Sequence, residues 1–195
     1  MAKTLLITVA IALTIPRFAS ADPTSIKAKV EEPVLPELMG GCSLKCAFAW
    51  GVEVQSAPGQ KPVAIKILND DKADSSWSAP KGTSGVGVKF RFIFPKKLTP
   101  ELEGTPLYGL DLVDGDWKTE ESWKAHGRVK KARLYYNDKP FRDLLFSDSR
   151  RWQRVSFPDI FVRSGDSMTL EILEIYPGEK GDGAAISEIV LQGAH

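Results

Sequence analysis

Few of the residues from which enzymes build catalytic and metal sites occur in this chain. Its 195 residues include two histidines, His126 and His195, and two cysteines. Neither histidine has a nearby nucleophile or a His-x-x-x-His partner, and the chain lacks Gly-x-Ser-x-Gly and phosphate-binding glycine motifs. Adjacent acids such as Glu120–Glu121 and Asp70–Asp71 lie in polar stretches, where carboxylates are usually solvated. We therefore predict that the protein is not an enzyme, and a hydrolase is the weakest hypothesis for it.

An excess of charge of one sign is also missing. Lys and Arg number 26 and Asp and Glu number 25, which gives a formal net charge of +1. Nucleic-acid-binding domains carry a marked positive excess, so this balance gives no reason to expect a nucleic-acid partner. The length suits one domain with a full hydrophobic core.

Long hydrophobic runs are absent apart from one near the N-terminus. Leu5–Ile15 is an apolar run of eleven residues between Lys3 and the small residues Ala19–Ala21. It is too short to cross a bilayer, which takes about 20 residues. A basic start, a short apolar run and small residues are typical of a signal peptide. We predict that residues 1–21 are a cleaved signal peptide, that no segment spans a membrane, and that the mature protein is secreted or periplasmic. The alternative is that the segment stays uncleaved as a membrane anchor.

The two cysteines lie in a segment without apolar periodicity. Residues 22–47 contain three prolines and are predicted to form an N-terminal arm. In an extended strand Cys42 and Cys46 would lie about 13 Å apart, beyond the roughly 4.4–6.8 Å between the Cα atoms of a disulfide. A helical turn or tight loop brings them into range, and export permits the bridge. A Cys42–Cys46 disulfide is the favoured prediction, two reduced thiols are the alternative, and two cysteines alone are too few for a zinc site.

From residue 48 onward the sequence consists of short apolar runs separated by turns. The clearest is "GVGVKFRFIF" at residues 85–94, where apolar residues alternate with polar ones in the period of two that indicates a half-buried strand. Its apolar face is expected to comprise Val86, Val88, Phe90, Phe92 and Phe94. Short strands without long helices are typical of antiparallel sandwiches, so we predict an all-β protein with a jelly-roll β-sandwich over residues 48–195. About nine strands are predicted, at 48–56, 62–68, 85–94, 108–113, 128–136, 139–146, 151–157, 167–176 and 186–192.

The end of the chain is apolar where a frayed, polar terminus is more usual. Tyr176-Pro177-Gly178 predicts a turn, and the strand after it carries Ile186, Ile189 and Leu191, which are expected to re-enter the core. A terminal strand in a sandwich covers a sheet edge that would otherwise stay open. We therefore expect the last hairpin of the sandwich here.

A polar loop over residues 68–85 offers oxygen ligands. It holds three Asp, one Asn and two Ser within eight residues, a composition that resembles a calcium-binding loop. Turns stabilised by Asp and Asn side chains have the same composition and are the commoner case. Trp77, within this loop, is expected to close the end of the core.

The loop after the fourth predicted strand is rich in aromatic and basic residues. Trp117, Trp123, His126 and Arg128 lie within twelve residues. Aromatic rings stack on the apolar face of a sugar and basic groups bind its hydroxyls, so this composition suits carbohydrate recognition. The alternative is that one Trp seals the sandwich while the basic residues keep the loop soluble.

The order of these features resembles a known family. The stretches "NDDKADSSW", "SGVGVKFRF", "WKAHGRVKKARLYYNDKPFRDLLFSD" and "LEILEIYPGEKGDGAAISEI" follow one another as in discoidin-like domains of the galactose-binding fold. The pattern is most similar to the secreted bacterial NADase-type glycan-binding domains. The resemblance covers about residues 48–192, and Tyr-Pro-Gly followed by Ile-Ser-Glu-Ile is its most specific part.

The resemblance implies a jelly-roll sandwich that binds glycans through loops at one end. It does not imply NAD hydrolysis, which belongs to a separate catalytic domain. It also implies structural calcium in some relatives, with Asp70, Ser75 and Glu188 at the matching positions. Three departures weaken transfer of detail: Lys72 stands where calcium-binding relatives tend to carry an acid, Ala125–Arg128 reads Ala-His-Gly-Arg in place of an Asn-Gly-Arg motif, and "GDGAAISEI" has one extra residue.

The leading prediction is a secreted, non-catalytic carbohydrate-binding module whose ligand contacts are Trp117, Trp123, His126 and Arg128. The alternative is a secreted protein-interaction or adhesion module on the same sandwich, with an interface formed by the N-terminal arm and Trp152, which is flanked by arginines. The predicted partner is accordingly a glycan or glycosylated surface, or another secreted protein. Structural calcium is the one cofactor expected.

Overall fold

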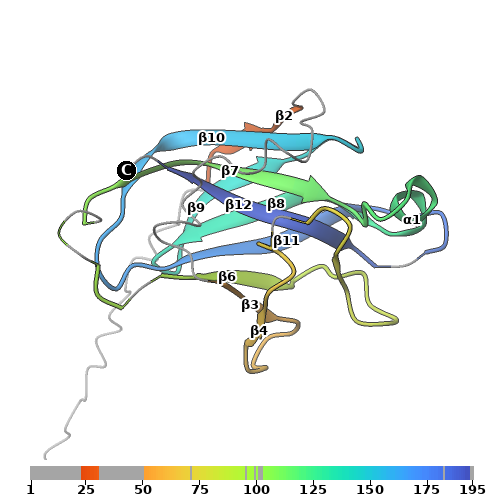
Figure 1. Ribbon diagram of the computed structural model, residues 1–195, viewed down its shortest axis with the longest axis horizontal. Coiled ribbons are helices and arrows are strands. Elements are labelled where there is room, and N and C mark those ends of the chain that lie inside the picture. The colour runs from red at the N-terminus through yellow and green to blue at the C-terminus, as the bar shows by residue number, and fades with distance from the viewer. Residues whose placement is uncertain are drawn as a thin grey trace, which may run out of the picture.

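The computed structural model describes residues 23–30 and 51–193, except 71, 95, 99, 101–102 and 182. These residues form twelve strands and one short helix, with the strands in two sheets that pack face to face (Figure 1). The predicted all-β sandwich is confirmed. The predicted signal peptide and the predicted Cys42–Cys46 disulfide lie outside the described residues.

One sheet has seven strands in the order β1-β9-β8-β11-β6-β3-β4. All its pairings are antiparallel except the parallel one between β1 and β9. Its strands are β1 (Ser25–Lys27), β9 (Lys139–Leu145), β8 (Arg128–Tyr136), β11 (Met168–Tyr176), β6 (Lys89–Ile93), β3 (Gly51–Gln55) and β4 (Val63–Ile65).

The other sheet has five strands in the order β2-β10-β7-β12-β5, all antiparallel. The helix α1 (Glu120–Ala125) lies in the connection from β7 to β8. No helix in the described part of the chain is long and apolar enough to cross a membrane. The strands of this sheet are β2 (Lys29–Val30), β10 (Trp152–Phe161), β7 (Pro106–Asp114), β12 (Ala185–Gly193) and β5 (Trp77–Ser78).

Each of the nine predicted stretches contains a strand, and three further strands were not predicted. These three, β1, β2 and β5, have two or three residues each. So short a segment cannot display the alternation on which strand prediction depends. Their pairing is decided by neighbouring strands rather than by their own sequence.

Two of the unpredicted strands connect the start of the arm to both sheets. β1 pairs with β9 and β2 pairs with β10. Between them Ala28 donates its backbone N–H to the Leu145 carbonyl at 2.8 Å, and its side chain is buried in the core. Residues 25–30 therefore cross from one layer of the sandwich to the other.

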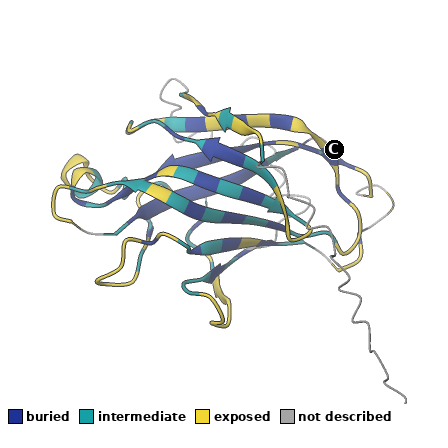
Figure 2. Ribbon diagram, turned by 180° about the vertical axis from the view of Figure 1, so that it is seen from behind, coloured by how far each residue is buried: buried dark blue, intermediate teal, exposed yellow. Residues whose placement is uncertain are grey.

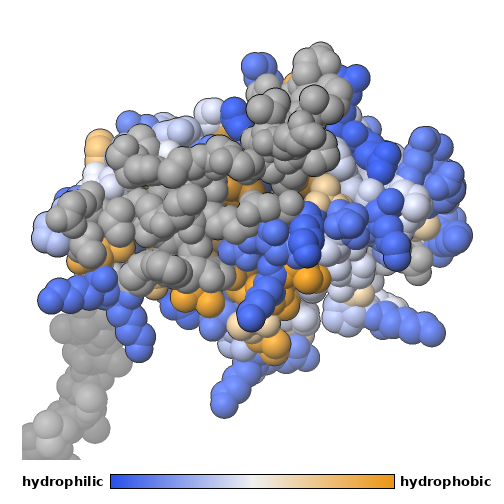
Figure 3. All heavy atoms as spheres, in the orientation of Figure 1, coloured by the Kyte–Doolittle hydropathy of each residue, from blue (hydrophilic) through white to orange (hydrophobic). Residues whose placement is uncertain are grey.

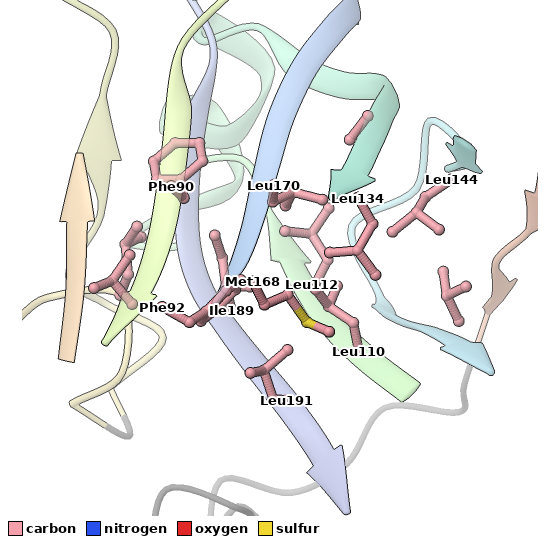
Figure 4. Close-up of a cluster of buried hydrophobic side chains, with 14 of the residues drawn as sticks. Phe90, Phe92, Leu110, Leu112, Leu134, Leu144, Met168, Leu170, Ile189 and Leu191 are labelled. Atoms are coloured by element: carbon pink, nitrogen blue, oxygen red, sulfur yellow. The ribbon is translucent and has the colours of Figure 1, made fainter. Parts of the chain in front are cut away.

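The core lies between the two sheets and is formed by alternate residues of each strand. Figure 4 shows side chains of β6, β8 and β11 meeting those of β7 and β12. Figure 2 shows the resulting alternation of buried and more exposed positions along the strands. Period-two alternation thus correctly predicted which face is apolar, because only one face of each strand meets the opposite sheet.

One residue of the predicted apolar face lies elsewhere. Val88, Phe90 and Phe92 are buried, whereas Val86 is 50% exposed. Gly85 and Gly87 have φ of 86° and 85°, so the chain turns on either side of Val86 before β6 begins at Lys89. The alternation in the sequence therefore extends beyond the strand itself.

Trp77 closes the core as predicted. It is 8% exposed, and its ring meets Phe90 edge-on with centroids 4.9 Å apart. Ile186, Ile189 and Leu191 also enter the core as expected. The strand that carries these three residues, β12, pairs with β7 along most of its length and with the two-residue β5 on its other side. The expected hairpin is wrong, because the preceding strand β11 lies in the other sheet and does not pair with β12.

Candidate functional site

Three connections meet at one end of the sandwich, beside α1 on the right of Figure 1. They are the loops over residues 79–88, 115–127 and 177–184. Backbone hydrogen bonds join them to one another, which fixes their relative positions. The bonds run from Ala79 N to Ala184 O (2.8 Å), Ala184 N to Ser84 O (3.0 Å), Gly127 N to Gly183 O (3.0 Å) and Glu179 N to Lys124 O (2.9 Å).

Glycines allow this close approach. A Cβ atom on Gly178 would lie 2.1 Å from the Ala125 carbonyl oxygen, and one on Gly183 would lie 2.2 Å from the Thr83 carbonyl oxygen. Both contacts are with backbone atoms, which cannot rotate away. The glycine of the Tyr-Pro-Gly turn is therefore required by the packing of the loop against its neighbour.

The loops surround a cavity of about 510 Å³, which we call the loop cup. Its walls include the apolar residues Pro80, Ile175 and Pro177, and its polar groups come from Lys81, Thr83, Ser84 and His126. Hydrophilic side chains dominate this end of the surface in Figure 3. Apolar walls with a few polar groups are typical of small-molecule sites of this size.

His126 is the one predicted contact residue that lines the loop cup. It follows α1, whose first turn is capped by the Thr119 side chain, which accepts a hydrogen bond from Ser122 N. The Nδ1 atom of His126 lies 2.9 Å from the Ser122 carbonyl. Because a carbonyl can only accept, Nδ1 carries the proton and donates it, which leaves Nε2 of the neutral ring as an acceptor.

The two tryptophans direct their polar atoms into the protein. Trp117 Nε1 and Trp123 Nε1 both donate to the Asp114 carbonyl, each at 2.9 Å. Ser187 Oγ ties the same loop to β12, because it donates to the Gly115 carbonyl at 2.9 Å and accepts from Trp117 N at 3.2 Å. Both indoles are partly buried, and neither lines the loop cup.

Arg128 is 7% exposed, and its guanidinium contacts Asp148, His126 and Trp123. Its guanidinium donates through Nε and Nη2 to the two carboxylate oxygens of Asp148, both at 2.9 Å, and through Nη1 to the His126 carbonyl at 2.7 Å. It also lies over the Trp123 ring, 4.7 Å from the centroid. The structure thus brings the four predicted residues together, although His126 alone lines the loop cup. Arg128 contacts the His126 carbonyl and the Trp123 ring behind the cup. Trp117 shares the Asp114 carbonyl with Trp123.

Asp114 lies at the base of this arrangement. Its side chain is buried, and Oδ1 accepts from Val129 N at 2.9 Å, while Oδ2 has no hydrogen-bond partner among the described residues. Burial raises the pKa of Asp114 well above its ordinary value, although the Val129 amide and the Arg128 charge act in the opposite direction. Sequence reasoning missed this residue because an Asp at the end of a strand ordinarily faces solvent.

The three predicted calcium ligands also come together. Lys72 donates its backbone N–H to both Asp70 Oδ1 and Glu188 Oε1, each at 3.0 Å. Ser75 Oγ lies 3.1 Å and 3.2 Å from the two Asp70 carboxylate oxygens. Glu188 is fully buried, so the final strand does point back to the polar loop. There its Oε1 accepts the backbone N–H of Lys72.

The donor chemistry of this cluster suits calcium only in part. Its ligand atoms are hard oxygens, yet calcium takes about six to eight of them. Across the described residues, no group of three or more His, Cys, Asp or Glu side chains is placed to hold a metal ion. Calcium therefore stays a prediction.

Two described parts of the interface predicted for the alternative function, Trp152 and residues 29–30 of the arm, lie in the five-stranded sheet. Trp152 opens β10 opposite Val113 of β7. On the other side of β10, Gln153 and Arg154 pair with Val30 and Lys29 of the arm. Residues 29–30 of the arm are thus joined to β10 and cover this part of its edge.

Solved structures share the fold at low sequence identity. The CBM32-1 and CBM32-2 domains of Clostridium perfringens ZmpB in complex with GalNAc match with a TM-score of 0.57 and 9% identity, over 90% of this chain and 41% of that one. A ZmpB structure that also holds the M60 catalytic domain matches with a TM-score of 0.56 and 9% identity, over 92% and 17%. This chain therefore spans less than half the length of either structure.

Sequence comparison gives the family. No curated protein sequence matches the chain. The family profile described as NAD glycohydrolase translocation F5/8 type C domain matches residues 52–192, which is most of the sequence. The predicted resemblance to discoidin-like domains is thereby confirmed, and the chain belongs to the NAD glycohydrolase translocation F5/8 type C domain family.

Proposed function

We propose that the protein is an exported, non-catalytic module that binds a glycan in the loop cup. The observation that carries this proposal is the cup itself, a cavity of about 510 Å³ whose loops are locked together by backbone hydrogen bonds. A site held rigid before binding loses little conformational entropy when the ligand enters. The fold similarity to ZmpB domains in complex with GalNAc supports a sugar as the ligand class.

The polar groups of the cup match what a sugar offers. Nε2 of His126 accepts a hydrogen bond from a hydroxyl, while the Lys81 ammonium, which has no hydrogen bond or ion pair with any described residue, donates to one. Pro80 and Pro177 provide apolar surface for the C–H face of the ring. In this proposal Trp117, Trp123 and Arg128 position His126 instead of touching the ligand.

We expect His126→Ala to weaken glycan binding by roughly three- to tenfold, the loss of one hydrogen bond in a partly buried site. Glycan-array screening identifies the ligand, and titration calorimetry with that glycan measures the dissociation constant. Lys118→Ala, an exposed cation on the same loop outside the cup, is the matched control and should bind normally. Absence of retention on every glycan class would refute the proposal.

Calcium is tested separately, by the thermal unfolding midpoint in calcium and in chelator. If Asp70, Ser75 and Glu188 hold calcium, excess calcium raises the midpoint by mass action, and Glu188→Gln removes that increment. His126→Ala should keep it, because that residue lies in the loop cup. A midpoint that is the same in calcium and in chelator would contradict the calcium prediction.

A further inference from the structure

The outer face of the seven-stranded sheet carries a lattice of polar side chains. Cross-strand pairing places Glu53, Arg91, Thr169 and Tyr135 side by side across β3, β6, β11 and β8. The next row along the same strands contains Gln55, Lys89, Glu171 and Arg133. These rows lie on the side of the sheet opposite the core.

The charged side chains of the second row are already paired with each other or with neighbouring residues. Lys89 Nζ lies 3.8 Å from Glu171, and Glu171 also accepts a hydrogen bond from the Tyr135 hydroxyl. Farther along the row, Arg133 donates to Asp143 at 2.6 Å. These groups are held in place by one another and have little capacity left for a ligand.

The first row is different because its charged groups are unused. Glu53 and Arg91 stand directly opposite each other, yet neither side chain makes a hydrogen bond or ion pair with any residue that the structure describes. Asp138, at the turn after β8, is likewise without a partner in that part of the chain. All three keep their donors and acceptors available.

Thr169 is smaller than its neighbours, so the sheet surface is hollowed between Arg91 and Tyr135. The hollow has a volume of about 270 Å³ and is lined by residues of both rows and by Asp138. A second hollow of about 260 Å³ adjoins it and shares Glu53 and Arg91 as lining residues. Together they form a groove across the sheet, centred on the Glu53–Arg91 pair, and each half approaches the size of a small-ligand site.

The walls of this sheet groove are rigid. The Tyr135 hydroxyl is fixed by Glu171, and the Lys89 ammonium lies 5.2 Å from the centre of the Tyr135 ring. The turn that presents Asp138 is fixed as well, because Asn137 donates to Asp166 at 2.8 Å and accepts from Ser167 N at 2.8 Å. A ligand therefore meets groups that are already positioned.

The charges of the groove balance. A strongly charged ligand would be repelled by the groups of one sign as it was attracted by those of the other. The cations that line the two hollows are Lys89, Arg91 and Lys96, and the anions are Glu53, Asp138 and Asp166. A ligand with many hydroxyl groups and no net charge suits both, since hydroxyls donate to carboxylates and accept from guanidinium. We propose that the sheet groove is a second binding site, for a neutral saccharide, separate from the loop cup.

Two sites on one chain would change how it binds a surface. The loop cup lies at the end of the sandwich and the groove lies on a sheet face, and they share no lining residue. A glycan-covered surface could engage both at once, which raises avidity beyond the affinity of either site.

The test is an amide chemical-shift titration of the full chain by NMR, with galactose, N-acetylgalactosamine, glucose, mannose and fucose as probes. We expect at least one sugar to move the signals of residues around Glu53 and Arg91. Arg91→Ala should weaken that response about tenfold or more, the loss of a charge-assisted contact. Lys66→Ala, an exposed cation outside the groove, is the matched control and should leave the response intact.

The two sites are distinguished by which signals move and which variant abolishes them. If a sugar moves the amide signals around Glu53 and Arg91 in the His126→Ala variant but not in the Arg91→Ala variant, the second site is supported. This holds whatever happens to the signals of the loop cup. If sugars move only the cup signals, or no signals at all, the groove is not a saccharide site and this inference is wrong. In the first of those outcomes the proposed function survives unchanged.

Discussion

Replacement of Gly178 by alanine is expected to destabilise the protein by about 3–5 kcal/mol and to abolish ligand binding in the loop cup. The added Cβ would lie 2.1 Å from the Ala125 carbonyl oxygen and 2.6 Å from the His126 carbonyl oxygen. Such separations are well inside contact distance, so the loop over residues 177–184 must move away from the β7–β8 connection.

That movement breaks more than one contact. The hydrogen bonds from Glu179 N to Lys124 O and from Gly127 N to Gly183 O both join the loops that would separate. His126 lies between these bonded positions and lines the cup, so its distance from the residues on the other side of the cup would no longer be fixed. We therefore expect stability and binding to fall together.

Gly59→Ala, between β3 and β4 and outside both proposed sites, is the matched control. Gly59 has φ of 78° and no atom within 4 Å of an added Cβ, so alanine there meets backbone strain but no clash. The expected cost is about 1–2 kcal/mol. Urea unfolding gives both free energies, and glycan titration under conditions where both variants are folded gives binding. Equal losses in the two variants would show that loop packing is not what makes Gly178 necessary.

Local sequence patterns predicted the strands around these loops but not the contacts between the loops. Alternation around Phe90 and Phe92 predicted β6, and the apolar residues of Ile-Ser-Glu-Ile predicted β12, because each pattern reflects contacts of its own segment with the core. The predicted hairpin was wrong because local patterns do not show which sheet a strand joins, and β11 and β12 belong to different sheets. The reason for Gly178 is a carbonyl more than fifty positions earlier in the chain. No local pattern carries that information.

The same limit applies to the predicted binding residues. Composition drew attention to the loop that contains Trp117, Trp123 and His126. It could not reveal that both indole N–H groups turn inward to the Asp114 carbonyl, or that Asp148, twenty residues beyond Arg128, receives its guanidinium. The Glu53–Arg91 groove escaped notice because alternating charges on an outer sheet face look like ordinary solvated surface.

Arg128→Ala is expected to lower the free energy of unfolding by about 2–4 kcal/mol, which makes Arg128 a positioning residue rather than a ligand contact. The substitution removes the paired hydrogen bonds to Asp148, the bond to the His126 carbonyl and the stacking on Trp123. Arg128→Lys keeps the charge but loses the planar fork, so its loss should be intermediate. Asp148→Ala should cost less than Arg128→Ala, because the Asp148 side chain is 40% exposed.

Asp114 gives this prediction a pH dependence that a simple ligand contact would not have. Burial already holds the pKa of Asp114 above its ordinary value, and the Arg128 charge partly opposes that rise, so Arg128→Ala raises the pKa further. A folded-state pKa above the unfolded value means that stability is greatest when the group is protonated and is lost as the pH rises through the folded pKa. The difference in unfolding free energy between the wild type and Arg128→Ala should therefore be largest near neutral pH and smaller in acid. Urea unfolding of both proteins at several pH values measures this difference. A variant that binds no glycan yet unfolds like the wild type would instead make Arg128 a direct ligand contact.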